Sequence, residues 1–255
     1  MNQLSIIKIG GNVLDNPTTL TQVLKDFSAL KSPKILVHGG GKLADDVLKK
    51  LNIIPEKING RRITDEPTLE VAVMVYAGLI NKKITAQLQS FGCDAIGITG
   101  ADLNILQAHK RIVQDIDYGF AGDIDAVNIN KLSGLLALSD AVVFAPITHD
   151  KYGQLLNTNA DTIASALAVA FSEKQHVTIK YIFEKSGVLR DKDDANSVIE
   201  NISNTDYIKG VADGTFSDGM IPKLLNAFNA KKQGVKEVFI CGIENIFSDG
   251  GTRII

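Results

Sequence analysis

Short runs of β-branched and other apolar residues alternate with longer amphipathic segments along the whole chain. The apolar runs, which we expect to be buried strands, span residues 4–9, 35–37, 94–99, 141–147, 177–183 and 237–241. The segments with apolar residues at helical spacing, which we expect to be helices, span residues 18–30, 42–51, 65–89, 161–171 and 220–232. This alternation predicts an α/β fold with a mostly parallel sheet covered by helices.

The longest predicted helix, over residues 65–89, begins in the motif Thr64-Asp65-Glu66-Pro67. Asp65 is suited to cap it, and Pro67 is tolerated in the first turn, where a missing N–H costs nothing. The apolar stripe of this helix consists of Leu69, Val73, Tyr76, Ile80 and Ile84. The spacing predicts one continuous amphipathic helix.

Domain boundaries are weakly marked, because no linker rich in proline, glycine or serine separates the predicted elements. A polar turn near residues 172–175 is the best-placed boundary, which predicts lobes over residues 1–174 and 175–255. The polar stretch of residues 107–127 predicts hairpins and loops that could form a lid over a site.

Composition and charge exclude several classes of protein. The chain has 255 residues with 45% hydrophobic and 22% charged side chains, and its net charge of -2 gives no overall attraction to nucleic acid or an anionic membrane. No apolar run approaches the roughly 18 residues of a membrane span, and the amino terminus lacks a signal peptide's basic region. Cys93 and Cys241 lie far apart without metal-ligand spacing, which favours reduced, buried thiols. We therefore expect a cytoplasmic protein with neither nucleic-acid nor membrane partners.

Two predicted strands end in glycine-rich turns, at Gly10-Gly11 and at His38-Gly39-Gly40-Gly41. Such turns let backbone N–H groups approach a phosphate or carboxylate closely, although each alone is equally well explained as a tight strand-to-helix connection. Lys8, inside the first strand, favours an anionic ligand because a buried ammonium is costly without one. Neither turn matches the Walker A or dinucleotide-binding patterns.

Two later turns add charge at the start of predicted helices. Residues 157–161 supply two amides and a carboxylate, of which Asn159 or Asp161 could simply cap the helix. Lys223 falls in the first turn of the other helix, where the helix dipole disfavours a cation and an anionic partner is favoured. Lys8, Asp161 and Lys223 together suit phosphoryl transfer, which needs charge neutralisation and no protein nucleophile.

Six segments, taken together, resemble the amino acid kinase family, and within it the enzymes that phosphorylate N-acylated glutamate. They lie in the family's order at residues 8–11, 38–41, 59–64, 157–161, 186–189 and 218–223. The resemblance implies a three-layer αβα sandwich around a mostly parallel sheet in two lobes, the first for acyl-glutamate and the dimer interface and the second for ATP. It also implies transfer of the γ-phosphoryl group of ATP, with Mg²⁺ carried by the nucleotide, to a side-chain carboxylate in arginine biosynthesis.

The resemblance also implies individual roles. Lys8 and Lys223 neutralise charge on the phosphoryl group, and Asp161 holds both lysines. Backbone N–H groups that contact the phosphoryl oxygens belong to Gly11 and Gly40. The substrate is bound by Gly40, Gly41, Arg62, Asn157 and Asn159, with Arg62 on its α-carboxylate. The nucleotide is bound by Lys8, Gly10, Ser186, Gly187, Leu189, Asp218, Gly219, Met220 and Lys223. No protein metal ligands are expected, and a carboxylate acceptor with a pKa of about 4.3 needs no general base.

Several points stay open in the sequence. Glu184-Lys185 stands where the family usually has Asp-Val, which leaves details of the ATP contacts undecided. Arg61 is by default a surface residue, and the alternative is a contact with an acyl group bearing its own carboxylate, such as succinyl. Only seven residues precede Lys8, whereas arginine-inhibited members carry an amino-terminal helix, so we expect a homodimer through residues 65–89 without arginine feedback. The rival hypotheses are a carbamate, amino acid or UMP kinase of the same fold, and a non-catalytic nucleotide sensor.

Overall fold

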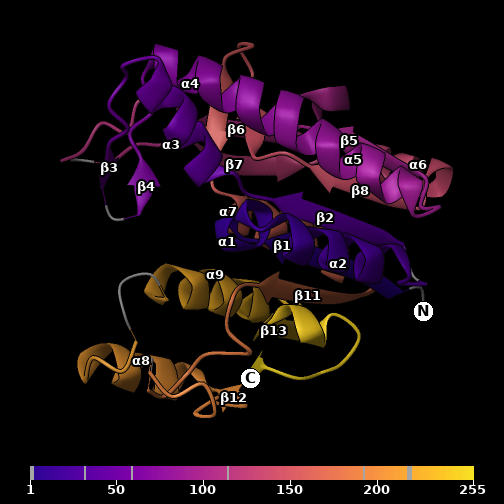
Figure 1. Ribbon diagram of the computed structural model, residues 1–255, viewed down its shortest axis with the longest axis vertical. Helices are drawn as coiled ribbons and strands as arrows, with labels where there is room; N and C mark the ends of the chain where they lie inside the picture. Colours follow the sequence, from indigo (N-terminus) through magenta and orange to yellow (C-terminus); the bar gives the residue numbers. More distant parts are fainter. Residues whose placement is uncertain (1–2, 32, 59, 114, 192, 217–219) are drawn as a thin grey trace. The chain divides into compact units, whose positions relative to one another are not determined.

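The computed structural model describes residues 3–31, 33–58, 60–113, 115–191, 193–216 and 220–255 (Figure 1). The chain divides into two compact units, one of Met1–Lys34 with Ala164–Ile255 and the other of Ile35–Ile163. We call them unit 1 and unit 2. The units group residues 1–34 and 164–174 with the carboxyl-terminal part of the chain, unlike the expected lobes. The division of ligands between lobes 1–174 and 175–255 stays a prediction.

The sheet of unit 1 has the strand order β12-β14-β13-β11-β1. Its strands are β1 (Gln3–Ile9), β11 (His176–Ile182), β12 (Asn201–Ile202), β13 (Glu237–Cys241) and β14 (Thr252–Ile254). β11 runs parallel to β1 and β13, and β14 runs antiparallel to β13 and parallel to β12. The inner strands are apolar on both faces and almost fully buried, as their sequences predict.

The helices of unit 1 are α1 (Gly11–Asp15), α2 (Pro17–Ser28), α8 (Asn204–Ala212) and α9 (Ile221–Lys232), together with most of α7 (Ala160–Ser172) and the 3₁₀ turn η3 (Ile243–Asn245). α2 has proline at its first position, and the Asn16 side chain accepts the N–H of Thr19 at 3.0 Å. α9 packs beside β13 and buries Leu224, Ala227 and Phe228 (Figure 1). α9 therefore covers the sheet with an apolar stripe.

Unit 2 contains the strand order β2-β8-β5, from β2 (Lys34–His38), β8 (Ala141–Phe144) and β5 (Ala95–Ile98), with β5 parallel to β8. Its helices are α3 (Gly41–Lys50), α4 (Glu66–Ala72), α5 (Asn81–Ser90) and α6 (Ile129–Leu138), together with the 3₁₀ turn η2 (Asp102–Asn104). The short hairpin β3 (Lys57–Ile58) and β4 (Arg61–Arg62) follows α3. The predicted α/β class with a mostly parallel sheet is confirmed.

Unit 2 also holds a closed four-stranded barrel of order β10-β7-β6-β9. Its strands are β6 (Leu106–Lys110), β7 (Ala121–Val127), β9 (Ile147–His149) and β10 (Leu155–Thr158). The stretch 107–127 does contain an antiparallel pair, β6 with β7, but this pair belongs to the barrel rather than to a run of loops. The strand expected over residues 141–147 ends at Phe144, and Ile147 already belongs to β9.

The predicted helix over residues 65–89 is helical throughout, but its middle is the π-helix η1 (Val73–Ile80). Asp65 caps α4 as expected, because its carboxylate accepts the N–H of Thr68 at 3.0 Å. In η1 the Asn81 N–H bonds to the carbonyl oxygen of Tyr76, five residues earlier, which is the hydrogen-bond spacing of a π-helix. Met74 and Leu79 on this segment are exposed.

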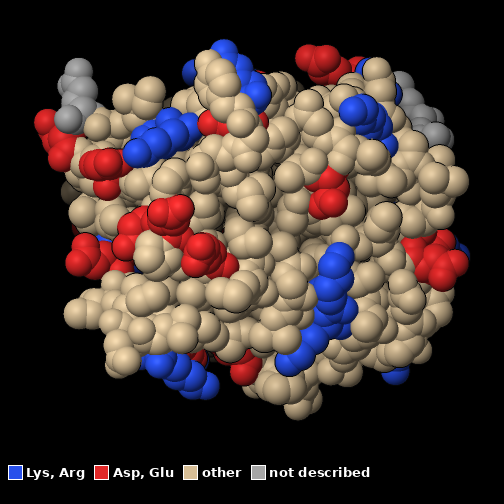
Figure 2. Space-filling view, turned by 90° about the horizontal axis from the view of Figure 1, so that it is seen from above, with Lys and Arg blue, Asp and Glu red and all other residues tan. Residues whose placement is uncertain are grey.

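Charges of both signs form small separate groups on the face shown in Figure 2, most of which is uncharged. Across the residues that the structure describes, no helix combines the length and apolar character that crossing a membrane demands. Cys93 and Cys241 are both free and buried, as their sequence spacing predicts.

Candidate active site

The glycine turn after β2 is shaped by the side chains of η1. Gly40 has φ +152°, a conformation that L side chains rarely adopt. A Cβ atom there would overlap Ile80 and lie 2.9 Å from Cδ1 of Tyr76. Gly40 is the N-cap of α3, and the Gly40 N–H donates to no acceptor among the described residues. The turn therefore presents backbone N–H groups at the start of a ten-residue helix, a geometry suited to an anion.

Arg62, the predicted ligand of the substrate α-carboxylate, is buried beside this turn. Its Nη2 donates to the carbonyl oxygen of Gly41 at 2.9 Å, and its Nη1 pairs with the carboxylate of Asp45. Lys57 also donates to Asp45, at 2.6 Å. Burial raises the pKa of Asp45, but the hydrogen bonds and charges of Arg62 and Lys57 outweigh it and hold the pKa below its ordinary value. Arg62 and Gly41 are thus brought together, with the guanidinium held by the protein itself.

Residues 157–161 connect the barrel to α7. Nδ2 of Asn157 donates to the hydroxyl of Thr64 at 3.1 Å, and that hydroxyl donates to the carbonyl oxygen of Arg62 at 3.1 Å. Oδ1 of Asn159 accepts the N–H groups of Asp161 and Thr162, at 2.8 and 3.2 Å. Asn159 therefore caps α7, and Asn157 lies in the same bonded network as the strand that carries Arg62.

Arg61 is half-buried, and its contact with an acyl group stays a prediction. Its pKa is lowered by burial and then by the Arg111 guanidinium, against the opposing effects of Asp123, Tyr118 and Asp161. Nη1 of Arg111 pairs with both carboxylate oxygens of Asp123, at 2.7 and 2.9 Å. The guanidinium groups of Arg61 and Arg111 therefore lie near each other in unit 2, and the charge of Asp161 acts on Arg61.

In unit 1, Lys8 is only 8% exposed and lies on β1 opposite Tyr181 of β11. The Gly10 N–H donates to the carbonyl oxygen of Ile182 at 3.3 Å, and a Cβ at Gly10 would lie 3.9 Å from Nζ of Lys8. Lys223 is half-buried in the first turn of α9, as predicted. Lys8 and Lys223 thus belong to unit 1 and Asp161 to unit 2. Their meeting at one phosphoryl group stays a prediction.

A cavity of about 630 Å³ in unit 1 is lined by three of the nine predicted nucleotide residues, and Lys8, Gly10 and Lys223 are not among its lining residues. The three are Gly187, Leu189 and Met220, and the unusual pair Glu184 and Lys185 lines the cavity as well. Ser186 lies within the same segment, whereas Asp218 and Gly219 lie outside the described residues. The sequence motifs therefore converge on one space large enough for a small ligand.

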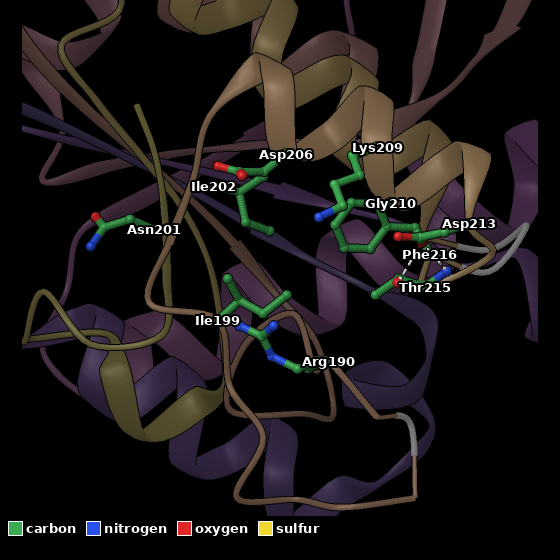
Figure 3. Close-up of a pocket in the computed structure, with 10 residues that line it drawn as sticks. All are labelled: Arg190, Ile199, Asn201, Ile202, Asp206, Lys209, Gly210, Asp213, Thr215 and Phe216. Atoms are coloured by element: carbon green, nitrogen blue, oxygen red, sulfur yellow. Dashed lines mark hydrogen bonds between the residues drawn. The ribbon is translucent and has the colours of Figure 1, made fainter.

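A second cavity in unit 1, of about 230 Å³, has Arg190, Thr215 and Phe216 in common with the first (Figure 3). Lys209 reaches it from α8, and Arg190 and Ile199 approach from the opposite loop (Figure 3). Hydrogen bonds from Thr215, through its hydroxyl and its N–H, hold the pKa of Asp213 below its ordinary value. This cavity is therefore mixed in charge.

Sequence reasoning missed four buried polar residues: His38, Asn81, Tyr76 and Lys180. The ammonium of Lys180 donates to the backbone carbonyls of Asn245, Ile246 and Ser248, at 3.0, 3.2 and 2.5 Å. Its signal was present in the sequence, because it stands inside an apolar strand as Lys8 does. The signals of His38 and Asn81 were weaker, since both stand next to segments already explained as a turn and a helix. No cluster of three or more His, Cys, Asp or Glu that could hold a metal occurs among the described residues.

The fold and these features define a class: α/β proteins that present glycine turns and buried cations to a small anionic ligand. The profile of the Amino acid kinase family matches residues 3–242, and the chain belongs to this family, which confirms the resemblance. Acetylglutamate kinase of Cytophaga hutchinsonii is 52% identical over 96% of this chain and 94% of that protein. Acetylglutamate kinase of Bacteroides fragilis is 48% identical over 99% of this chain and 97% of that protein.

Solved structures agree on the fold. The crystal structure of smu.665 from Streptococcus mutans has a TM-score of 0.83 at 24% identity, covering 98% of each chain. Carbamate kinase from Giardia lamblia bound to AMP-PNP has a TM-score of 0.72 at 13% identity, covering 100% of this chain and 98% of that chain. At these identities the likeness extends to the fold alone.

Proposed function

We propose that the protein transfers the γ-phosphoryl group of ATP to the side-chain carboxylate of an N-acyl-L-glutamate, a step of arginine biosynthesis. A carboxylate oxygen forms a bond to the γ-phosphorus, the bond from that phosphorus to the bridging oxygen breaks, and ADP leaves with the electron pair. Full-length relatives named acetylglutamate kinase support this proposal. The observation that carries it is Arg62, buried and bonded to Gly41 at the glycine turn.

The acceptor is bound by Gly40, Gly41, Arg62, Asn157 and Asn159. Arg62 orients the α-carboxylate, because a planar guanidinium matches a carboxylate at two points. Nη1 and Nη2 of Arg62 are bonded to Asp45 and Gly41, so a bound α-carboxylate adds to or replaces one of these bonds. The link from Asn157 through Thr64 to the Arg62 backbone supports a shared role for these groups.

The phosphoryl group is neutralised by Lys8 and Lys223, which Asp161 orients, while Gly11 and Gly40 contribute backbone N–H groups. The nucleotide takes the 630 Å³ cavity, which Gly187, Leu189 and Met220 line. The resemblance adds Gly10, Ser186, Asp218 and Gly219 to the proposed nucleotide contacts. Mg²⁺ is carried on the nucleotide phosphates, since this cation is usually bound through substrate phosphates and water. When bound, it screens the phosphate charge.

The proposed function is tested by incubating the protein with MgATP and N-acetyl-L-glutamate and trapping the acyl phosphate with hydroxylamine. We expect hydroxamate with the wild type and at least a hundredfold less with Lys8→Met. Lys34→Met is the matched control, because Lys34 is also a buried strand lysine but donates to the carbonyls of Ser28 and Leu30, at 2.7 and 2.8 Å. Absence of hydroxamate with every acyl-glutamate would refute the proposed function.

A second acceptor, an N-acyl-glutamate whose acyl group has its own carboxylate, such as succinyl, is favoured by Arg61 and Arg111. The side chain of Arg61 has no hydrogen bond or ion pair within the described ranges, although it is half-buried. We expect Arg61→Met to raise KM for N-succinylglutamate at least tenfold and to leave KM for N-acetylglutamate within twofold. Equal or better use of the acetyl compound by the wild type would reject the succinyl alternative.

The rival hypotheses are separable by substrate. A carbamate, amino acid or UMP kinase would phosphorylate one of those acceptors and ignore acyl-glutamates, and a sensor would bind ATP without turnover. We propose a cytoplasmic homodimer for the working form, supported by exposed Met74 and Leu79 on η1. Light scattering that finds another oligomer would contradict the dimer.

A further inference from the structure

His38, the last residue of β2, lies fully buried at the start of the glycine turn. Its Nδ1 is 2.7 Å from the carbonyl oxygen of Gly39, and its Nε2 is 3.3 Å from Nδ2 of Asn81. Burial lowers the pKa of His38 to about 4, although the hydrogen bond to Gly39 opposes this change. The imidazole is therefore neutral at physiological pH and carries one proton, on one of two nitrogens.

Asn81 determines which nitrogen carries that proton. Its Nδ2 donates to the carbonyl oxygen of Val143 at 3.0 Å, and a carbonyl can only accept, so the amide orientation is fixed. The second N–H of the same amide points to Nε2 of His38, which must then be the acceptor. The proton of His38 accordingly lies on Nδ1 and is donated to Gly39. Oδ1 of Asn81 is buried without a hydrogen-bond partner among the described residues, and this unsatisfied oxygen costs the folded state free energy.

The bond to Gly39 sets the direction of the next N–H. The Gly39–Gly40 peptide is planar and trans, so its carbonyl and its N–H point in opposite directions. With the carbonyl held by His38, the Gly40 N–H points away from His38. On its other side Gly40 is confined by Tyr76 and Ile80, where even a Cβ atom would not fit.

The π-helix brings these groups to one place. The Asn81 N–H bonds to Tyr76 five residues earlier, so the two residues lie one above the other. In α-helical geometry the residue above Tyr76 would be Ile80, and Asn81 would be turned away from His38. η1 thus lets one helix face both confine Gly40 and bond to His38, in keeping with the frequent occurrence of π-segments at functional sites.

We propose that Asn81 and His38 are positioning residues that aim the Gly40 N–H at the transferring phosphoryl group. This inference rests on the proposed function, in which Gly40 contacts that group. Neither side chain touches substrate in this role. Both act through the orientation of one peptide.

The test uses side chains that replace one imidazole nitrogen at a time. His38→Asn places an amide N–H where Nδ1 was, and His38→Gln places its amide where Nε2 was. We expect His38→Asn to keep at least a third of the wild-type kcat. We expect kcat to fall at least tenfold in His38→Gln and in Asn81→Ala. In all three variants KM for both substrates is expected to stay within threefold of the wild-type value. Val37→Ala, on the same buried strand, is the control for lost stability, and its kcat is expected within twofold of wild type.

Two NMR measurements test the positioning role without turnover. The ¹⁵N shifts of His38 are expected to show a proton on Nδ1 in the wild type and exchange between tautomers in Asn81→Ala. The Gly40 amide proton is expected to move downfield with MgADP and aluminium fluoride in the wild type and His38→Asn, and not in His38→Gln. Equal kcat for His38→Asn and His38→Gln, an Nε2 proton, or an unmoved wild-type Gly40 amide would each overturn the proposal. Absence of acyl-glutamate phosphorylation alone would instead reject the proposed function.

Discussion

Buried, neutral His38 makes the stability of the fold depend on pH. In the unfolded chain this imidazole titrates near 6.5, whereas burial lowers the pKa in the folded state to about 4. Between these values the unfolded state binds a proton that the folded state does not, so stability is fully present above about pH 6.5 and is lost as the pH falls toward 4. At about 1.4 kcal/mol for each pKa unit, the contribution is about 3 kcal/mol.

The measurement is urea unfolding at several pH values from 8 to 4, followed by circular dichroism, for the wild type and His38→Asn. Other groups that titrate in this range affect both proteins alike. The difference between the two proteins isolates His38, because asparagine does not titrate. We expect His38→Asn to gain about 3 kcal/mol relative to the wild type between pH 7.5 and 4, with Val37→Ala showing no such change. A pH-independent difference would refute a buried, neutral His38.

Three further substitutions or reagents test separate features. Gly40→Ala is expected to lower the free energy of unfolding by about 3 kcal/mol and to lower kcat at least tenfold. Gly78→Ala is the control, because a Cβ there meets nothing within 4 Å, and it is expected to change the free energy of unfolding by less than about 1 kcal/mol. Lys180→Met is expected to cost about 3 kcal/mol in thermal unfolding with kcat within threefold, and a hundredfold loss of kcat would show a direct role. Burial raises the pKa of Cys241 to about 12, so a thiol reagent at pH 8 should label it only after denaturation; rapid labelling of the native protein would contradict its burial.

The strands and the helix caps were largely predictable from the sequence. Residues 4–9 and 177–183 became β1 and β11 within one residue at each end, because continuous apolar runs flanked by polar turns are distinctive. Asp65 and Pro67 marked the start of α4 for a local reason, since capping depends on a few adjacent residues. Such features are encoded by neighbours in the chain.

The elements that were missed depend on weaker or non-local signals. α8 has a capping box made by Ser203 and Asp206, where the common pattern has Glu or Gln at the second position. The barrel pairs β10 with both β7 and β9, and register between distant strands is not written in any short segment. The π-helix leaves the apolar spacing of residues 69–84 nearly unchanged. The periodicity of the sequence therefore predicted the helix, but it could not predict the shift in backbone hydrogen bonding that brings Asn81 to His38.

Two of the buried strand lysines, Lys8 and Lys180, show how far residue type alone can support a functional inference. Lys8 and Lys180 both interrupt an apolar strand, and the burial cost that favoured an anion for Lys8 applies equally to Lys180. Three carbonyl oxygens satisfy Lys180, and they come from the loop around η3, more than sixty residues further along the chain. Burial of a strand lysine therefore predicts hydrogen-bond acceptors around its ammonium group, and these acceptors need not carry a charge. What distinguishes Lys8 in the sequence is the glycine turn that follows it at once, because such a turn at the start of a helix favours an anion.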